Sequence, residues 1–132
     1  MRTLTLLLFA SGIAYSQLAA AGMRDNQVAV DWDNIRANYM IHSGSATYPE
    51  PPTKTDRALT FHFEGKAAKQ VFDQIGPDAK VKCSAEKGDR ERRKKGVSCI
   101  YTAHLNDPND FHYTCWVGIN LGTGDGDVRV SC

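Results

Sequence analysis

Four cysteines constrain the fold more than any other feature of this 132-residue chain. They are Cys83, Cys99, Cys115 and Cys132, so all of them lie in the second half. No two have the C-x-x-C spacing that zinc ribbons and thiol oxidoreductases use. An even number of widely spaced cysteines in a short chain is typical of a disulfide framework formed in an oxidising compartment. The sequence therefore predicts two structural disulfides, no metal site and no cofactor.

The first 21 residues have the composition of a secretory signal peptide. Met1-Arg2 precedes an apolar run from Leu4 to Tyr15, and the small residues Ala19–Ala21 precede Gly22. We expect cleavage after Ala21, with an alternative site before Gln17. The apolar run of 12 residues is shorter than the roughly 20 residues that span a bilayer. The sequence thus predicts a periplasmic or secreted protein without membrane insertion.

The charge balance argues against a nucleic-acid partner. Arg2 is the only charged residue of the first 21, so the rest of the chain keeps 15 of the 16 Lys and Arg residues against 15 Asp and Glu residues. Proteins that bind nucleic acid by neutralising phosphates normally carry an excess of cations. The predicted mature chain has no such excess.

Composition divides the remaining chain into two parts. Residues 22–56 end in a polar, proline-rich stretch that is typical of a linker, and the only helix that apolar spacing predicts there covers Trp32–Met40. Regular hydrophobic periodicity starts near Arg57. We therefore predict a signal peptide at 1–21, a variable N-terminal segment at 22–56 and a disulfide-stapled domain at 57–132. This domain is expected to fold after deletion of the chain up to Thr55.

Within 57–132 the periodicity predicts one helix and five strands. Ala58–Glu64 alternates like a half-buried strand, and helical spacing follows over residues 66–75, ended by Gly76-Pro77. Further strands are expected from Val81, over 97–105, over 111–121 and over 127–132, joined by turns at 106–110 and 122–126. The order β-α-β-β-β-β predicts an α+β fold, in which one helix covers one face of an antiparallel sheet.

The expected strand register predicts how the cysteines pair. A turn centred on Pro108 sets Cys99 opposite Val117, and the last hairpin sets Val117 opposite Cys132, so that all four sulfurs lie on the helix-covered face. Diagonal neighbours on adjacent strands are close enough to be bridged. The expected disulfides are Cys83–Cys99 and Cys115–Cys132.

Residues 56–132 resemble a family of small exported proteobacterial proteins to which no function is assigned. The matching segments are Asp56-Arg57-x-Leu59-Thr60, Gly65-x-Ala67-Ala68-Lys69, Gly88-Asp89-Arg90-x-Arg92-Arg93-Lys94-x-Gly96-x-Ser98-Cys99, Tyr113-x-Cys115-x-x-Gly118-Ile119-x-Leu121-x-Thr123-Gly124 and the terminal Cys132. The resemblance implies a bacterial source and an exported location. It implies no catalytic residue.

A basic loop and one tryptophan are the candidate binding residues. Residues 86–96 hold six cations and three acids. One interpretation is a solvated hairpin tip, and the other is a rigid loop that docks on a protein with an acidic patch. Trp116 is expected on the face opposite the helix, either covered by the N-terminal segment or exposed as a binding anchor. The candidate binding residues are Arg90, Arg92, Arg93, Lys94, Lys95 and Trp116.

Two histidines offer an alternative, catalytic interpretation. The expected register sets His104 opposite His112 on the outer face, which Glu64 shares if its strand joins the same sheet. Two histidines with a carboxylate can perform general acid–base catalysis, as in small secreted ribonucleases. The competing interpretation is that these are polar strand residues. We therefore expect a protein-binding, inhibitor or immunity-type module of the bacterial envelope, with a small secreted hydrolase as the alternative.

Overall fold

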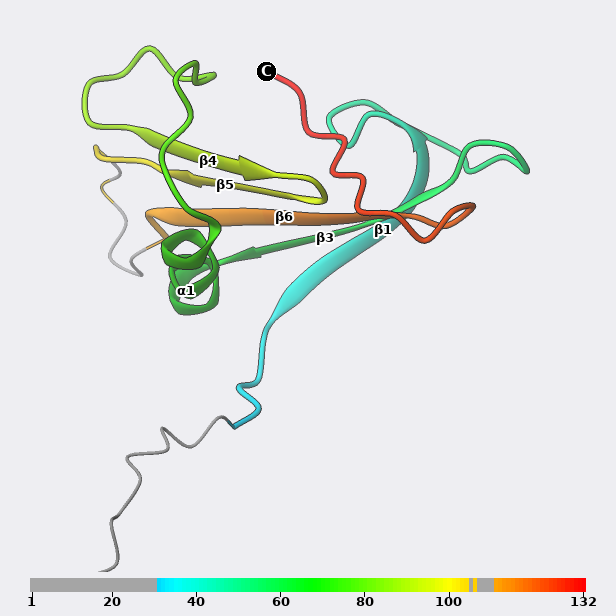
Figure 1. Cartoon of the computed structure of the whole chain (residues 1–132), viewed down its shortest axis with the longest axis horizontal. Helices are drawn as coiled ribbons and strands as arrows, with labels where there is room; N and C mark the ends of the chain where they lie inside the picture. Colours follow the sequence, from blue (N-terminus) through cyan, green and yellow to red (C-terminus); the bar gives the residue numbers. More distant parts are fainter. Residues whose placement is uncertain (1–30, 105, 107–110) are drawn as a thin grey trace, which may run out of the picture. The chain divides into compact units, whose positions relative to one another are not determined.

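The structure, a computed structural model, describes residues 31–104, 106 and 111–132. The predicted signal peptide and most of the predicted 106–110 turn lie outside these residues. Residues Asp33–Cys132 form one compact unit. Its elements are β1 (Ala37–Gly44), β2 (Pro49–Glu50), β3 (Ala58–Glu64), α1 (Gly65–Ile75), β4 (Arg90–Lys94), β5 (Val97–Tyr101) and β6 (Tyr113–Asn120) (Figure 1).

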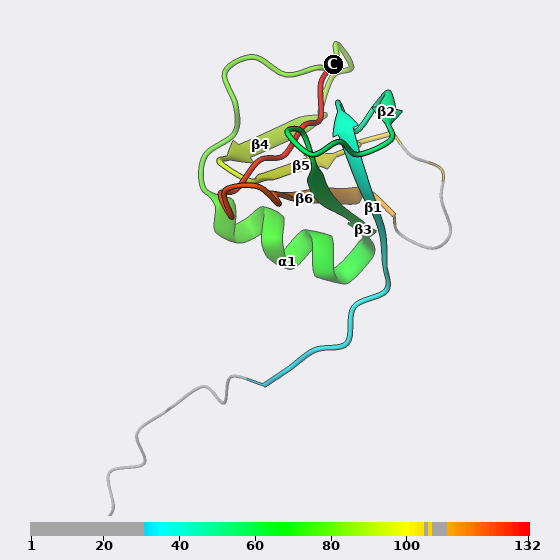
Figure 2. The same ribbon diagram turned by 90° about the vertical axis from the view of Figure 1, so that its right-hand side faces the viewer.

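All six strands belong to one antiparallel sheet in the order β2-β1-β3-β6-β5-β4. Helix α1 lies against one face of this sheet, as Figure 2 shows. The predicted α+β class, with a covering helix and two disulfides, is confirmed. We call the face that carries α1 the helix face and the opposite one the outer face.

The core lies between α1 and the central strands. Alternation in β3 places Phe63 under the helix, and helical spacing places Ala68 and Phe72 over the sheet. Phe72 has no exposed surface, so its burial contributes about 2–3 kcal/mol. The helix ends at Gly76, whose φ of 113° favours glycine, as the sequence predicts.

The N-terminal part of the sheet differs from the sequence prediction. Residues expected as a helix and linker form β1, which pairs with β3 from Ala37 to His42. His42 is buried on the outer face, where its Nε2 lies 2.9 Å from Thr60 Oγ1. Because β1 buries a polar side chain, its hydrophobic pattern does not indicate a strand. The folded unit thus begins well before the expected boundary at residue 57.

The chain after α1 also departs from expectation. Residues 76–89 form no strand, and the next strand, β4, lies inside the predicted basic loop. Residues 127–132, which we call the C-terminal segment, also form no strand. Instead, this segment crosses the outer face, where the Asp127 amide donates to the Gly118 carbonyl at 2.9 Å.

Both predicted disulfide pairs are wrong. The observed bonds are Cys83–Cys132 and Cys99–Cys115. Cys99 lies directly opposite Cys115, whereas the expected register set it opposite Val117. A shift of two residues keeps every side chain on its expected face but changes its cross-strand partner. Only Cys99–Cys115 belongs to the core beneath α1.

Candidate functional site

The predicted basic loop, residues 86–96, contains the edge strand β4, and the arginines of β4 have partners within the chain. Arg90 Nε lies 2.8 Å from one carboxylate oxygen of Asp78, and Arg92 Nε lies 2.7 Å from the other. Both guanidinium groups also lie over the Phe72 ring, at 5.2 Å and 4.3 Å from its centroid. The hydrogen bonds from Arg90 and Arg92 lower the pKa of Asp78 from 3.8 to about 2. These two cations therefore stabilise the fold beside α1.

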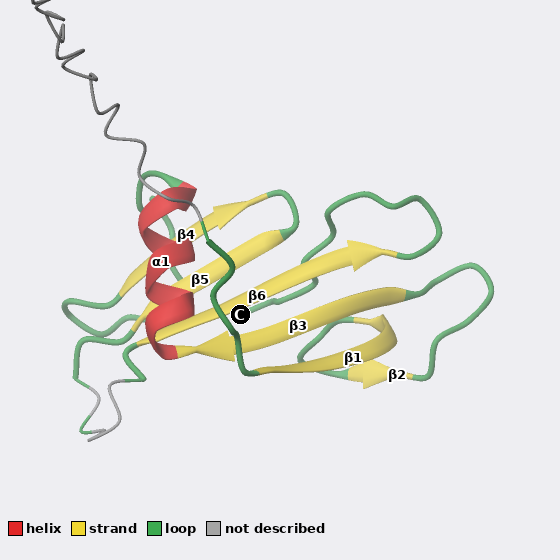
Figure 3. Ribbon diagram, turned by 90° about the horizontal axis from the view of Figure 1, so that it is seen from below, coloured by secondary structure: helices red, strands yellow, loops and turns green. Residues whose placement is uncertain are grey.

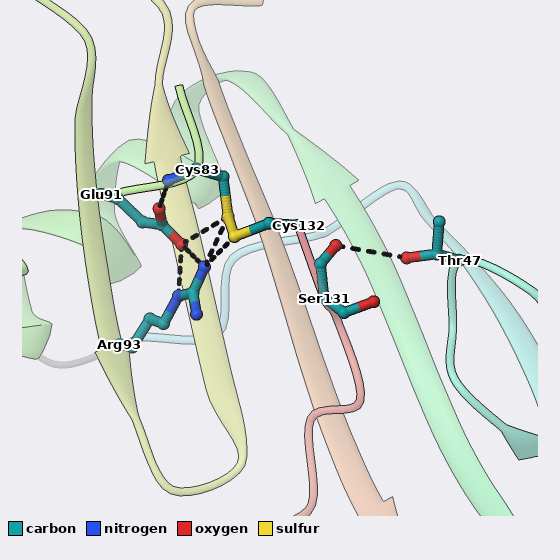
Figure 4. The surroundings of a disulfide bond; sticks show 6 residues. All are labelled: Thr47, Cys83, Glu91, Arg93, Ser131 and Cys132. Atoms are coloured by element: carbon teal, nitrogen blue, oxygen red, sulfur yellow. Dashed lines mark hydrogen bonds and ion pairs between the residues drawn. A yellow bond between two sulfur atoms is a disulfide. The ribbon is translucent and has the colours of Figure 1, made fainter. Parts of the chain in front are cut away.

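The remaining cations of this loop differ in their surroundings. Arg93 pairs with the buried Glu91 carboxylate on the outer face, beside the Cys83–Cys132 disulfide (Figure 4). Lys95 Nζ lies 3.3 Å from Asp125 Oδ1, and both side chains are exposed. Lys94 is exposed at the end of β4 and lines a shallow groove with Val97 and α1. Of the predicted docking cations, Lys94 and Lys95 are the best placed to meet a partner.

The two candidate catalytic histidines have separate local contacts. His104 Nε2 lies 3.0 Å from the Lys87 carbonyl oxygen, whereas His112 Nδ1 lies 2.6 Å from the Thr102 carbonyl oxygen. The Thr102 amide donates to the His112 carbonyl, so Thr102 rather than His104 lies opposite His112. Glu64 lies near His62 instead, with 3.8 Å between Oε1 and Nε2. The expected pairing of His104 with His112 is therefore wrong by two residues of register.

Trp116 lies on the outer face, as predicted. It belongs to β6, a central strand, and its ring packs at 5.3 Å against His62 on β3. His62 also lines a pocket with Glu64, Phe111 and the start of β1. Among residues 31–104, 106 and 111–132, no three His, Cys, Asp or Glu side chains are grouped to hold a metal ion.

The helix face carries an apolar surface that the sequence did not predict. A helix of 11 residues is about 16 Å long and about 10 Å wide, while six strands extend over about 24 Å. One such helix cannot cover this sheet, and α1 packs on β3, β4, β5 and β6. Figure 3 shows α1 crossing one end of the strands, while the other ends of β3 and β6 extend beyond it.

Two cross-strand rows make up this area, which Val117 connects to the core beneath α1. One row consists of Tyr39, Phe61 and Val117, and the other of Ile41, Leu59 and Ile119. Tyr39 is 70% exposed and Ile41 is 50% exposed, while the other four are partly exposed. We call these six residues the β1 apolar surface.

The sequence held one signal for the β1 apolar surface. Leu59, Phe61 and Phe63 alternate along β3, but only Phe63 lies in the buried core. The mismatch between a short helix and long apolar strand faces could have indicated an open region. The contribution of Tyr39 and Ile41 could not be seen while residues 32–40 were expected to form a helix and the residues after them a linker.

Comparisons with protein-family models, with curated proteins and with solved structures give no match for this chain. In the part of the chain that the structure describes, no helix is long and apolar enough to cross a membrane. The site is therefore interpreted from its own geometry.

Proposed function

We propose that this chain is a protein-binding module that docks its partner on the β1 apolar surface. The observation that carries this proposal is the pair of apolar rows across β1, β3 and β6, which α1 leaves uncovered. Contiguous exposed apolar surface on a folded domain is typical of an interaction site. Tyr39 supplies a large aromatic side chain, of the kind enriched among the residues that dominate binding energy.

Charge at the border indicates the chemistry of the partner. Val97 lies opposite Val117 at the end of one apolar row, and Lys94 lies opposite Val97. The row therefore runs from exposed Tyr39 to exposed Lys94 on the same face. A partner that places apolar side chains on the rows and an Asp or Glu near Lys94 matches this surface in both polarity and charge. The expected partner with an acidic patch is thus retained, but on the helix face.

Export to the bacterial envelope belongs to the same proposal. Two disulfides are compatible with an oxidising compartment, and the predicted signal peptide would direct the chain there. A small disulfide-stapled domain with an exposed binding surface suits an inhibitor or immunity-type protein. The hydrolase alternative rested on His104 lying opposite His112, and Thr102 takes that place instead.

The first experiment compares Ile41→Asp with Val81→Asp. Both replace an exposed apolar residue, at 50% and 85% exposure, but only Ile41 belongs to the β1 apolar surface. Envelope extract is passed over the wild-type and variant proteins, and partners are identified by mass spectrometry. We expect a protein that binds wild type and Val81→Asp but not Ile41→Asp.

Titration with the purified partner then tests the proposal quantitatively. Ile41→Asp should weaken the Kd at least about thirtyfold, because a charge would be buried among apolar groups. Lys94→Glu should weaken binding at low salt and have a smaller effect at high salt. Equal binding by Ile41→Asp and Val81→Asp would overturn the proposal. Sedimentation that shows self-association of wild type but not of Ile41→Asp would replace the partner with a second copy.

A further inference from the structure

The two disulfides differ in their access to solvent. Cys83 and Cys132 are both exposed, whereas Cys99 and Cys115 have no exposed surface. A dithiol reduces a disulfide by attacking one of its sulfur atoms along the axis of the S–S bond, so that sulfur atom must be accessible. Solvent access therefore favours reaction at Cys83–Cys132.

A cation lies beside the exposed disulfide (Figure 4). Arg93 Nη2 lies 2.8 Å from Cys83 Sγ and 3.6 Å from Cys132 Sγ. Glu91 also faces this site, and its carboxylate accepts from the Cys83 amide at 2.9 Å and pairs with Arg93. Glu91 Oε1 lies 3.9 Å from Cys83 Sγ, so the Arg93 guanidinium, at 2.8 Å, is the nearer charge. A nearby guanidinium stabilises a thiolate more than a thiol, which makes the adjacent sulfur a better leaving group.

We propose that Cys83–Cys132 is a thiol–disulfide exchange site that reacts with the reduced, dithiol form of thiol oxidoreductases. A thiolate of the dithiol attacks Cys132 Sγ, the Cys83–Cys132 bond breaks, and Cys83 leaves as a thiolate beside Arg93. The dithiol is now joined to Cys132 by a mixed disulfide. Its second thiol attacks the dithiol's own sulfur in this bond, so that Cys132 leaves as a thiolate and the dithiol becomes an internal disulfide. Two electrons and two protons pass from the dithiol to the protein, which gains two thiols.

Reduction has a local consequence for the C-terminal segment. The Arg129 side chain pairs with Asp56 and Asp127, and its carbonyl accepts from the Ala46 amide at 2.8 Å. Beyond Arg129 the described contacts are weaker, such as the 3.5 Å hydrogen bond from Thr47 Oγ1 to the Ser131 carbonyl (Figure 4). Reduction therefore releases residues 130–132, while Arg129 keeps the rest of the segment in place.

The test is graded reduction of the oxidised wild-type protein with dithiothreitol. Samples are quenched with an alkylating reagent at successive times and mapped by mass spectrometry. We expect Cys83 and Cys132 to be alkylated at least tenfold faster than Cys99 and Cys115. Equal rates, or faster reaction of the buried pair, would overturn the proposal.

Two further measurements test the roles of Arg93 and of the C-terminal segment. Replacing Glu91 and Arg93 together with Gln removes the cation without leaving the buried carboxylate unpaired, and replacing Lys95 with Gln and Asp125 with Asn is the matched loss of an ion pair elsewhere on the surface. Only the first variant should slow reduction, by about threefold or more. Hydrogen exchange in β3 and β6 should be unchanged in the partly reduced protein if reduction affects only the C-terminal segment. Loss of protection across the whole sheet would show a global unfolding step instead.

Discussion

Ion pairs stabilise the packing of α1 against the edge of the sheet, and Asp78, which pairs with both Arg90 and Arg92, is the central example. Its carboxylate accepts from Arg90 and Arg92, whose guanidinium groups lie on Phe72 at the end of the helix. The sequence marks these arginines as candidate docking residues, but in the structure they have partners within the chain. Their partner is 12 and 14 residues away, and the intervening chain forms no regular element that would predict its path.

The ionisation of Asp78 gives a prediction about stability at low pH. Because Arg90 and Arg92 lower its pKa from 3.8 to about 2, the carboxylate stabilises the folded state above about pH 4. That contribution is lost as the pH falls through about 2. Since the side chain is 42% exposed, we expect about 1 kcal/mol or less. Asp78→Asn should thus have a lower Tm than wild type at about pH 6.

Thermal unfolding followed by circular dichroism across this pH range is the appropriate measurement. The Tm difference between wild type and Asp78→Asn should shrink between about pH 4 and about pH 2. A difference that stays constant over this window would mean that the ionised carboxylate is not what stabilises the helix against β4.

A second residue-scale prediction concerns Gly118 on the outer face. A Cβ at this position would lie 2.3 Å from the Asp127 carbonyl oxygen and 2.8 Å from Val128 Cα. These are backbone atoms, so Gly118→Ala must displace the C-terminal segment, at a cost of about 1–3 kcal/mol. Gly122→Ala is the control, because its nearest neighbour is the Asn120 side chain at 3.2 Å. Urea denaturation should show the loss for Gly118→Ala and little change for Gly122→Ala.

At the scale of elements, β1 determines where the folded unit begins. Deleting the chain up to Thr55 would remove β1 and β2, expose the backbone edge of β3 and leave Thr60 without His42. We expect this deletion to abolish the cooperative unfolding transition, contrary to the prediction from sequence. Removal of residues 1–32 is the matched truncation and should preserve the transition. Calorimetry of both proteins makes the comparison, and a cooperative transition after the longer deletion would contradict the role of β1.

The elements that the sequence predicts correctly share one property: apolar residues recur along them with a regular period, that of a strand in β3 and that of a helix in α1. The predicted strand Ala58–Glu64 coincides with β3, and the predicted helix over 66–75 differs from α1 by one residue. In β1 the usual relation between polarity and burial is reversed, because His42 is buried while Tyr39 and Ile41 are exposed. Hydrophobic periodicity cannot identify such a strand. The same reversal creates the β1 apolar surface, so the missed strand and the missed site have one cause.

At the scale of the whole molecule, the disulfides connect regions that local patterns cannot relate. Cys99–Cys115 joins adjacent strands, and an error of two residues in register was enough to miss it. Cys83–Cys132 joins two segments without regular structure across the outer face, and its partners are separated by 49 residues. No strand periodicity sets the path of either segment. The sequence therefore predicts the number of disulfides but not their pairing.

Replacing Cys83 with Ala separates the observed pairing from the pairing expected from sequence. In the structure Cys132 loses its partner, so one free thiol should appear at Cys132 while Cys99–Cys115 stays intact. The pairing expected from sequence would instead free Cys99. Opening a loop with a sequence separation of 49 should lower the free energy of unfolding by roughly 4 kcal/mol in the chain-entropy model. Alkylation under non-reducing conditions with peptide mapping locates the thiol, and denaturant unfolding measures the loss. A labelled Cys99 would disprove the connection across the outer face, and with it the proposed exchange site.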